Sequence, residues 1–238
     1  GVHFIDADTG WIVGDSGTIL FTSNGGNTWE TVQLDSEASL SDVAFIDGSL
    51  GWVVGVEVIL RTSDGGNHWQ ERVMPDTFVL AVSFPDSKNG WAVAFYYSSG
   101  ILHDVIILHT DDGGQSWIPQ ESGAYTPLYD VVFVDSQNGW VVGIGWTIIH
   151  TSDGGAKWVR QDPITNSNLF GVAFWDTRFG IAIGRDGSIR TTINGGDSWS
   201  IVTSNVTTNL EKVAFGDVAN MWIVGDDGVI LRVNRIEA

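Results

Sequence analysis

Short apolar runs alternate with polar turns along this chain, and the runs recur at a nearly constant spacing. A strand-like stretch ending in aspartate, of which VAFID at 43–47 is typical, places phenylalanines at Phe4, Phe45, Phe84, Phe133, Phe174 and Phe215. The steps between them are 41, 39, 49, 41 and 41 residues, which divides the chain into units 1–40, 41–80, 81–128, 129–170, 171–210 and 211–238. A period near 41 is typical of propeller blades.

Each repeat unit divides into strands A to D at its turn signals. In the second unit strand A is VAFID, strand B is GWVVG, strand C is ILRT, and strand D begins at the tryptophan after a Gly-Gly turn. The sequence therefore predicts an all-β fold, a single β-propeller over residues 1–238 with six repeat units and four-stranded antiparallel blades. The last blade is predicted to be incomplete, because GVILRVNRIEA stops after strand C.

The turn between strands C and D repeats one pattern in five units: Ser or Thr, any residue, Asp or Asn, Gly-Gly, two further residues and Trp. Glycine takes positive φ at little cost, Asp and Asn accept backbone N–H groups, and a buried Trp ring covers roughly 150–250 Å². We therefore predict a structural role for the Asp or Asn and for the Trp of this pattern. They are Asn24, Asp64, Asp112, Asp153 and Asn194, and Trp29, Trp69, Trp117, Trp158 and Trp199.

This pattern resembles the Asp-box, also called the bacterial neuraminidase repeat. The fuller unit, GWVVG followed by ILRTSDGGNHW, is most similar to the repeat of photosystem II assembly and stability factors. The resemblance covers essentially the whole chain. It implies a propeller scaffold and a partner-binding patch of strand C arginines, to which Arg61 and Arg190 would belong by their RT context. Propellers of that family have seven blades, whereas this sequence has six units.

Composition narrows the classes of partner and the compartment. The 238 residues carry a formal net charge of −18, which argues against nucleic acid and anionic membranes as partners. Cysteine is absent, and no apolar run reaches the roughly 20 residues of a membrane-spanning helix. The chain starts at Gly1 without an initiator methionine, which favours a mature or trimmed product. We expect an exported protein, extracellular or periplasmic, without membrane insertion.

Candidate binding residues gather at one end of the predicted blades. The A–B and C–D turns share one end, here called the Gly-Gly end, and the B–C and D–A connections share the other, here called the loop end. Aromatic residues at the loop end suit contact with a protein or a glycan, although they could simply cover the apolar ends of longer loops. They are Tyr96, Tyr97 and Trp146 in B–C connections, with His103 in the third-unit insertion, and Phe78, Tyr125, Tyr129 and Phe170 in D–A connections.

A second candidate set occupies one position of strand C. That position holds a cationic or titratable side chain in five of six units, the exception being Phe21 in the first. The five are Arg61, His109, His150, Arg190 and Arg232. Such side chains could form a binding patch, or could thread between blades and pair with aspartates. His109 and His150 lack a nearby ligand set, so we predict no metal and no cofactor.

The sequence favours a binding module over an enzyme. A glycosidase needs two carboxylates across a cleft, and the best candidates, Asp42 and Asp130, fall on opposite sides of the predicted central opening. No Ser-His-Asp, phosphate-loop or zinc motif is present. We predict a non-catalytic interaction module or scaffold that binds a protein or glycan at the loop end. The alternative is a carbohydrate-active propeller, sialidase-like or another glycoside hydrolase.

The incomplete sixth blade indicates a second mode of binding. Strand C of that unit, GVILRV, should present an unpaired edge, which another strand could complete. A segment outside these residues or a neighbouring subunit could supply it. Alternatively, the tail NRIEA shields the edge.

Overall fold

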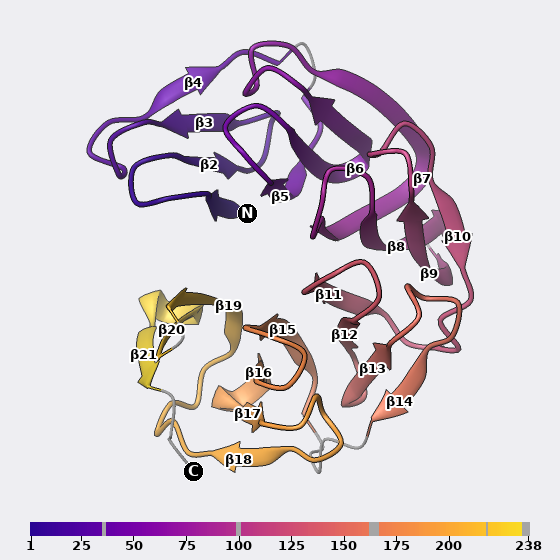
Figure 1. The fold of residues 1–238 in the computed structure, drawn as a ribbon, viewed down its shortest axis with the longest axis vertical. Helices are drawn as coiled ribbons and strands as arrows, with labels where there is room; N and C mark the ends of the chain where they lie inside the picture. Colours follow the sequence, from indigo (N-terminus) through magenta and orange to yellow (C-terminus); the bar gives the residue numbers. More distant parts are fainter. Residues whose placement is uncertain (35–36, 99–100, 162–166, 218, 235–238) are drawn as a thin grey trace. The chain divides into compact units, whose positions relative to one another are not determined.

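The computed structural model describes residues 1–34, 37–98, 101–161, 167–217 and 219–234. Within them, contacts divide the chain into two compact halves, an N-terminal half Gly1–Gln120 and a C-terminal half Glu121–Ala238. Strands make up each half, together with two 3₁₀ turns in the second (Figure 1). Among the described residues, no helix has the length and apolar character needed to cross a membrane. The single-domain organisation of residues 1–238 stays a prediction.

The N-terminal half contains two antiparallel sheets. The first has the order β1-β2-β3-β4, with strands β1 (Val2–Phe4), β2 (Gly10–Val13), β3 (Ile19–Thr22) and β4 (Glu30–Val32). The second has six strands in the order β10-β9-β8-β7-β6-β5. Its strands are β5 (Leu40–Phe45), β6 (Gly51–Thr62), β7 (Gln70–Ser83), β8 (Gly90–Ser98), β9 (Ile101–Thr110) and β10 (Ile118–Gln120).

The six-stranded sheet corrects the predicted blade count. The described residues form five sheets rather than six blades, because β6 and β7 each run through two predicted strands and join the second and third repeat units. Glu57 in β6 and Asp76 in β7 have positive φ, 59° and 55°, and the β6–β7 register shifts there, between Val56 and Val58. The Asp76 N–H also donates to the Glu57 carboxylate at 3.1 Å. Val56 pairs directly with Phe78, which links the two repeats in one ladder.

The C-terminal half contains three sheets with sequential strand order. The first comprises β11 (Leu128–Phe133), β12 (Gly139–Gly143), β13 (Thr147–Thr151) and β14 (Val159–Gln161). The second comprises β15 (Leu169–Phe174), β16 (Gly180–Gly184), β17 (Ile189–Thr192) and β18 (Ser200–Val202), with the 3₁₀ turn η1 (Arg185–Gly187). The third has three described strands, β19 (Leu210–Asp217), β20 (Asn220–Gly225) and β21 (Ile230–Asn234), with the 3₁₀ turn η2 (Asp226–Gly228).

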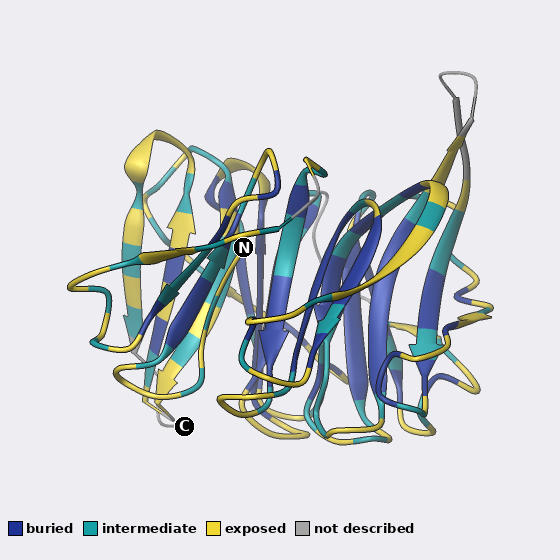
Figure 2. Cartoon of the chain, turned by 90° about the horizontal axis from the view of Figure 1, so that it is seen from above, coloured by how far each residue is buried: buried dark blue, intermediate teal, exposed yellow. Residues whose placement is uncertain are grey.

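Burial explains why strand B is apolar without alternation in the fourth and fifth repeats. Every residue of β12 and β16 is buried, because both faces of these strands are covered. Buried residues lie mainly within strands, whereas the connections are largely exposed (Figure 2), and strands β4, β10, β14 and β18 are mostly exposed.

Neighbouring repeats within each half are joined by a repeated aromatic stack. Trp11 stacks on Phe45 with ring centroids 3.6 Å apart, and Trp52 stacks on Phe84 at 3.4 Å. In the C-terminal half Trp140 stacks on Phe174 at 3.6 Å. Each of these strand B tryptophans is completely buried. The strand B Trp of one repeat and the strand A Phe of the next therefore form a contact that recurs between neighbouring repeats.

The Gly-Gly turn is held by the threonine that begins the repeated pattern. In the second repeat the buried Thr62 hydroxyl donates to Asp64 Oδ1 at 2.9 Å and accepts the Gly66 N–H at 2.9 Å. Asp64 Oδ1 also accepts the His68 N–H at 2.9 Å. The Gly65 N–H donates to the Ser49 carbonyl in the A–B turn at 2.9 Å, which ties the two turns of the Gly-Gly end together.

Candidate functional site

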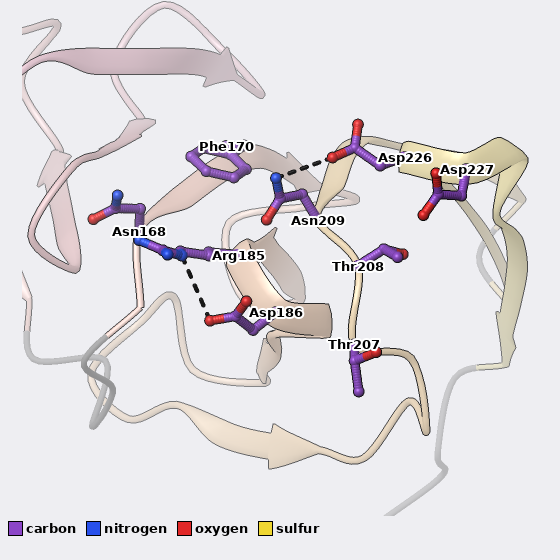
Figure 3. A pocket seen from close by; sticks show the side chains of 9 residues that line it. All are labelled: Asn168, Phe170, Arg185, Asp186, Thr207, Thr208, Asn209, Asp226 and Asp227. Atoms are coloured by element: carbon purple, nitrogen blue, oxygen red, sulfur yellow. Dashed lines mark hydrogen bonds and ion pairs between the residues drawn. The ribbon is translucent and has the colours of Figure 1, made fainter.

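The loop end of the C-terminal half contains a cavity of about 630 Å³ (Figure 3). Its walls come from the B–C turns of the fifth and sixth repeats and from the two D–A connections that lead into these repeats. The lining residues are Asn168, Phe170, Arg185, Asp186, Thr207, Thr208, Asn209, Asp226 and Asp227. We call this the loop-end cavity.

Two similar turns fix the walls of the loop-end cavity. The sequences Gly-Arg-Asp-Gly at 184–187 and Gly-Asp-Asp-Gly at 225–228 form η1 and η2. Asp186 and Asp227 each have positive φ, 55° and 57°, a conformation that Asp and Asn tolerate better than most residues. Each turn is anchored to a D–A connection, since the Arg185 N–H donates to the Asn168 carbonyl at 2.9 Å and the Asp226 N–H donates to the Asn209 carbonyl at 3.0 Å.

The lining has an excess of negative charge, with three carboxylates and one guanidinium. Arg185 Nε lies 3.5 Å from Asp186 Oδ2, but both side chains are largely exposed, so water weakens this pair. Asn209 Nδ2 donates to Asp226 Oδ2 at 3.0 Å. Burial, followed by the charge of Asp226, raises the pKa of nearby Glu211. The cavity therefore suits a polar or positively charged group.

Phe170 gives the loop-end cavity an aromatic wall. Its ring meets Tyr129 edge-on, with centroids 5.5 Å apart, and burial together with the charge of Glu211 raises the pKa of the Tyr129 hydroxyl. Two of the predicted aromatic residues are thus brought together at this site. Trp146 is 38% exposed, and the N–H of the preceding Gly145 donates to Asn168 Oδ1 at 3.0 Å. Tyr125 is almost fully exposed.

Sequence reasoning missed most of the residues that line the loop-end cavity. Arg185, Asp186, Asp226 and Asp227 lie in turns that were treated as ordinary strand connections. The sequence feature that could have identified them is a pair of similar acidic Gly-x-Asp-Gly turns in consecutive repeats. That pattern identifies the turns but does not show that they share one cavity.

The other predicted aromatic residues lie in the N-terminal half. Tyr96 and Tyr97, both in β8, are 38% and 42% exposed. Phe78 stacks on Phe95 at 5.2 Å and meets Tyr97 edge-on at 5.7 Å, so these rings also cover one another. The side chain of His103 lies outside the described residues. A binding role for Tyr96 and Tyr97 stays a prediction.

The strand C cations contact the scaffold. Arg61 Nε donates to the Gly113 carbonyl of the next Gly-Gly turn at 2.9 Å. Arg190 is 9% exposed, its guanidinium donates to the Ile189 carbonyl at 2.8 Å, and burial lowers its pKa. His150 stacks on Trp140 at 4.7 Å. The Arg61 bond connects two repeats and the His150 stack connects two strands, whereas the Arg190 bond stays within its own strand. The partner-binding role expected of Arg61 and Arg190 stays a prediction.

A second cavity, of about 430 Å³, lies at the Gly-Gly end of the N-terminal half. Phe21, at the strand C position, and the Gly65–Gly66 turn of the next repeat line it. In the following pair of repeats Arg61 reaches the corresponding turn by its hydrogen bond to Gly113. Phe21 has no side-chain donor and cannot make that bond, so the cavity stays open between its strand and the Gly65–Gly66 turn.

The two carboxylates considered for glycosidase chemistry hold backbone groups of neighbouring repeats. Asp42 Oδ2 accepts the Val82 N–H at 3.0 Å, and Asp130 Oδ2 accepts the Val172 N–H at 2.9 Å. Asp130 Oδ1 also receives a hydrogen bond from Lys212 Nζ at 3.0 Å. A strand bulge directly precedes each aspartate and turns it toward the adjacent repeat. Within the described residues, no three His, Cys, Asp or Glu side chains are arranged to hold a metal ion.

Comparisons with known proteins point to one family. The family model described as photosynthesis system II assembly factor YCF48 matches residues 27–123 and 118–202. The photosystem II assembly lipoprotein Ycf48 of Synechococcus sp. (strain CC9902) is 34% identical over 95 residues, which are 37% of this chain and 26% of that protein. The aligned part of the chain thus spans about a quarter of this relative's length.

Solved structures extend the likeness over the whole chain. A structure of Ycf48 bound to a D1 peptide covers 99% of this chain and 91% of its own, with a TM-score of 0.58 and 20% identity. An ancestral GH74 enzyme covers 98% of this chain and 37% of its own, with a TM-score of 0.69 and 15% identity. At these identities the likeness establishes the β-propeller fold alone.

Proposed function

The chain belongs to the photosynthesis system II assembly factor YCF48 family, and from this premise we propose that it is a non-catalytic module that binds a protein partner at its loop end. The observation that carries the proposal is the loop-end cavity, with its volume of about 630 Å³ and its polar lining. A relative in the same family has been solved with a bound peptide, which supports a peptide as the class of ligand.

The chemistry of the loop-end cavity favours a basic side chain of that partner. Its volume lies within the roughly 300–1,000 Å³ of ordinary ligand pockets, but its lining is more polar than is usual for an apolar small molecule. Carboxylates such as Asp186 and Asp227 pair with arginine or lysine, and the Phe170 ring can take a cation over its face. We therefore propose a peptide segment that inserts an arginine or lysine here.

A charge-matched pair of variants tests this proposal. Asp186→Asn with Asp227→Asn removes two cavity charges, and asparagine tolerates the positive φ of both positions. We expect the Kd for a fluorescein-labelled Gly/Ser peptide carrying two arginines to rise about tenfold, as expected for two lost charge pairs. Asp111→Asn with Asp197→Asn removes two exposed charges at the Gly-Gly end and should change the Kd less than about twofold. Fluorescence anisotropy measures both.

Equal weakening by the two charge-matched pairs would show that only net charge attracts the peptide, and it would contradict binding in the cavity. Unchanged binding in both pairs would contradict it as well.

Absence of catalysis is part of the same proposal. The family is named for assembly, and the carboxylates Asp42 and Asp130 are engaged by backbone N–H groups. The likeness to a GH74 enzyme concerns the fold, so a carbohydrate-active propeller remains the second candidate. Turnover of a sialoside or a β-glucan by the purified protein would overturn the proposal of a non-catalytic module.

We further propose that β21 can accept a strand from a partner. Among the described residues β21 pairs only with β20, which leaves its outer edge open. Residues 235–238, which could shield it, lie outside the described part. We expect fast hydrogen exchange at Ile230 to Val233 in the dilute isolated protein and slower exchange once a partner is bound. Slow exchange at these residues in the dilute protein without a partner would contradict strand addition at β21.

An exported location, extracellular or periplasmic, fits this proposal. The Synechococcus relative is named a lipoprotein, which supports export. Fractionation of native cells tests it, and recovery in the cytosol would contradict it.

A further inference from the structure

The second cavity, at the Gly-Gly end of the N-terminal half, is here called the Phe21 cavity. Strands C and D of the first repeat form one wall, and the Gly65–Gly66 turn of the second repeat forms the other. Its lining includes two carboxylates, Glu30 and Asp64, and no lysine, arginine or histidine. With a volume of about 430 Å³, the Phe21 cavity therefore has room for a cationic group that donates hydrogen bonds.

The next pair of repeats shows which group occupies the corresponding space. Between the second and third repeats the Gly113 carbonyl accepts one hydrogen bond from Trp52 Nε1 and one from Arg61 Nε, each at 2.9 Å. A side chain at Gly114 would collide with Trp52 Nε1, so the turn lies directly on the preceding repeat. In that pair a guanidinium connects strand C of one repeat to the Gly-Gly turn of the next.

The first pair of repeats lacks both of these hydrogen bonds. Phe21 stands where the second repeat has Arg61, and its side chain has no donor. The indole N–H of Trp11 is buried and has no partner among the described residues. The carbonyl of Gly65, which lines the Phe21 cavity, therefore receives neither of the two bonds that its counterpart accepts. It is an acceptor to which a ligand can bind.

A second difference between the repeats accompanies the loss of the arginine. The cross-strand partner of Phe21 is Glu30, whereas the cross-strand partner of Arg61 is Gln70. Glu30 is exposed and makes no hydrogen bond or ion pair with any described residue, while the carboxylate of Asp64 is engaged within its own turn. The first repeat thus lacks the internal guanidinium and has instead a free carboxylate beside the place of that guanidinium.

We propose that the Phe21 cavity binds a guanidinium group of a ligand, in the place that Arg61 takes in the next pair of repeats. The group donates to the Gly65 carbonyl and to the Glu30 carboxylate, and it lies against the Phe21 ring, to which cations are attracted. A guanidinium has five donors in a plane, so it can serve both acceptors at once. An ammonium group is a compact and strongly hydrated charge, and it fits such a site less well.

Nuclear magnetic resonance of the isotope-labelled protein tests the site, because amide shifts report binding residue by residue. The probe is N-acetyl-L-arginine amide, added at constant ionic strength. We expect shifts at residues 30–33 and 64–67 with a Kd of about 1 mM, an affinity within reach of a ligand of this size. N-acetyl-L-lysine amide should bind about fivefold more weakly or less tightly still. The loop-end variant Asp186→Asn with Asp227→Asn should keep these shifts, so the two proposed sites are tested separately.

Two substitutions that copy the second repeat should weaken binding of the arginine probe. Glu30→Gln introduces the residue type of Gln70 and should raise the Kd about fivefold or more. Phe21→Arg introduces an internal guanidinium that competes with the probe, so the Kd should rise about tenfold or more while the Tm stays at or above that of the wild type. Asp111→Asn removes one exposed carboxylate of the same half outside the cavity and should change the Kd less than about twofold.

A Gly/Ser peptide with one central arginine identifies the source of the guanidinium. Binding at least as tight as that of the amide probe assigns a polypeptide side chain, and weaker binding assigns a free guanidino compound. The proposal is overturned if about 20 mM arginine probe shifts no residue at 30–33 or 64–67, where even a Kd near about 10 mM would show. It is also overturned if the lysine probe binds as tightly as the arginine probe, or if Glu30→Gln or Phe21→Arg binds the probe like the wild type.

Discussion

Replacing Trp140 by alanine is expected to lower the free energy of unfolding by about 3–5 kcal/mol, the cost typical of a large-to-small change at a buried aromatic. Trp140 is completely buried and stacks on Phe174 at 3.6 Å, and its Nε1 donates to the Gly195 carbonyl at 3.0 Å. The substitution removes the stacked ring and one hydrogen bond between the fourth and fifth repeats. Denaturation in urea, followed by circular dichroism, measures the change.

Two controls separate the stack from other effects. Trp140→Phe keeps a stacked ring and loses the indole N–H, but the Gly195 carbonyl still accepts Gln161 Nε2 at 2.8 Å, so we expect a smaller loss of about 1–3 kcal/mol. Trp175→Ala, at a half-exposed position, should cost about 1 kcal/mol or less. A Trp140→Ala loss no larger than that of Trp175→Ala would contradict a stabilising role for the stack between repeats.

Acid is expected to destabilise the protein strongly between pH 4 and 2, through the aspartates of the Gly-Gly turns. A side-chain hydrogen bond from His68, then the His68 N–H, lowers the pKa of Asp64 to about 2. A side-chain hydrogen bond from Ser116, then the Ser116 N–H, lowers the pKa of Asp112 to about 2. The Lys157 N–H, followed by the Thr151 hydroxyl, lowers the pKa of Asp153.

The sign of this effect follows from the direction of the shifts. In the unfolded chain these carboxylates titrate near about pH 3.9, so below that value the unfolded state binds more protons than the folded state. Their contribution is complete above about pH 4 and is lost as the pH falls toward about 2. His109 and His150 act in the same direction from about pH 6.5 downward, because burial lowers their pKa values.

The chain supplies its own control for the acid prediction. Asn24 and Asn194 occupy the same turn position, and each accepts the same backbone N–H, from Thr28 at 2.9 Å and from Ser198 at 3.0 Å. Replacing Asp64, Asp112 and Asp153 by asparagine should therefore preserve the fold. The decrease in Tm between pH 4 and 2 should be smaller in this variant by about 5 °C or more. An equal decrease in both proteins would contradict the assignment.

The Gly-Gly turns and the repeat architecture were predictable from the sequence, whereas the way the strands combine into sheets was less so. The Gly-Gly turns depend on residues within eight positions of each other, from Thr62 to Trp69 in the second repeat, and their recurrence identified the all-β repeat architecture. The prediction of six blades was wrong because Glu57 and Asp76 let β6 and β7 continue through two expected turns. Positive φ at a non-glycine residue leaves little trace in the sequence.

The loop-end cavity was only partly predictable. Phe170 and Tyr129 stood out as aromatic residues at the loop end, and the structure brings them together. The carboxylates Asp186 and Asp227 lie 41 residues apart in the sequence, so their shared cavity depends on how two sheets pack. Thr62 and its counterparts begin the repeated pattern, but their role in holding the turn was not predicted, because a threonine at the end of strand C looks like an ordinary strand residue.

If a peptide partner binds at the loop end, in the cavity between the fifth and sixth repeats, it protects backbone amides there. Hydrogen exchange of the protein with and without a saturating concentration of the arginine-containing Gly/Ser peptide tests this directly. We expect slower exchange at residues 167–170, 185–188, 207–209 and 226–228, with no change at the Gly-Gly turns 153–157 and 194–198. Protection confined to the Gly-Gly turns, or no protection at all, would contradict it.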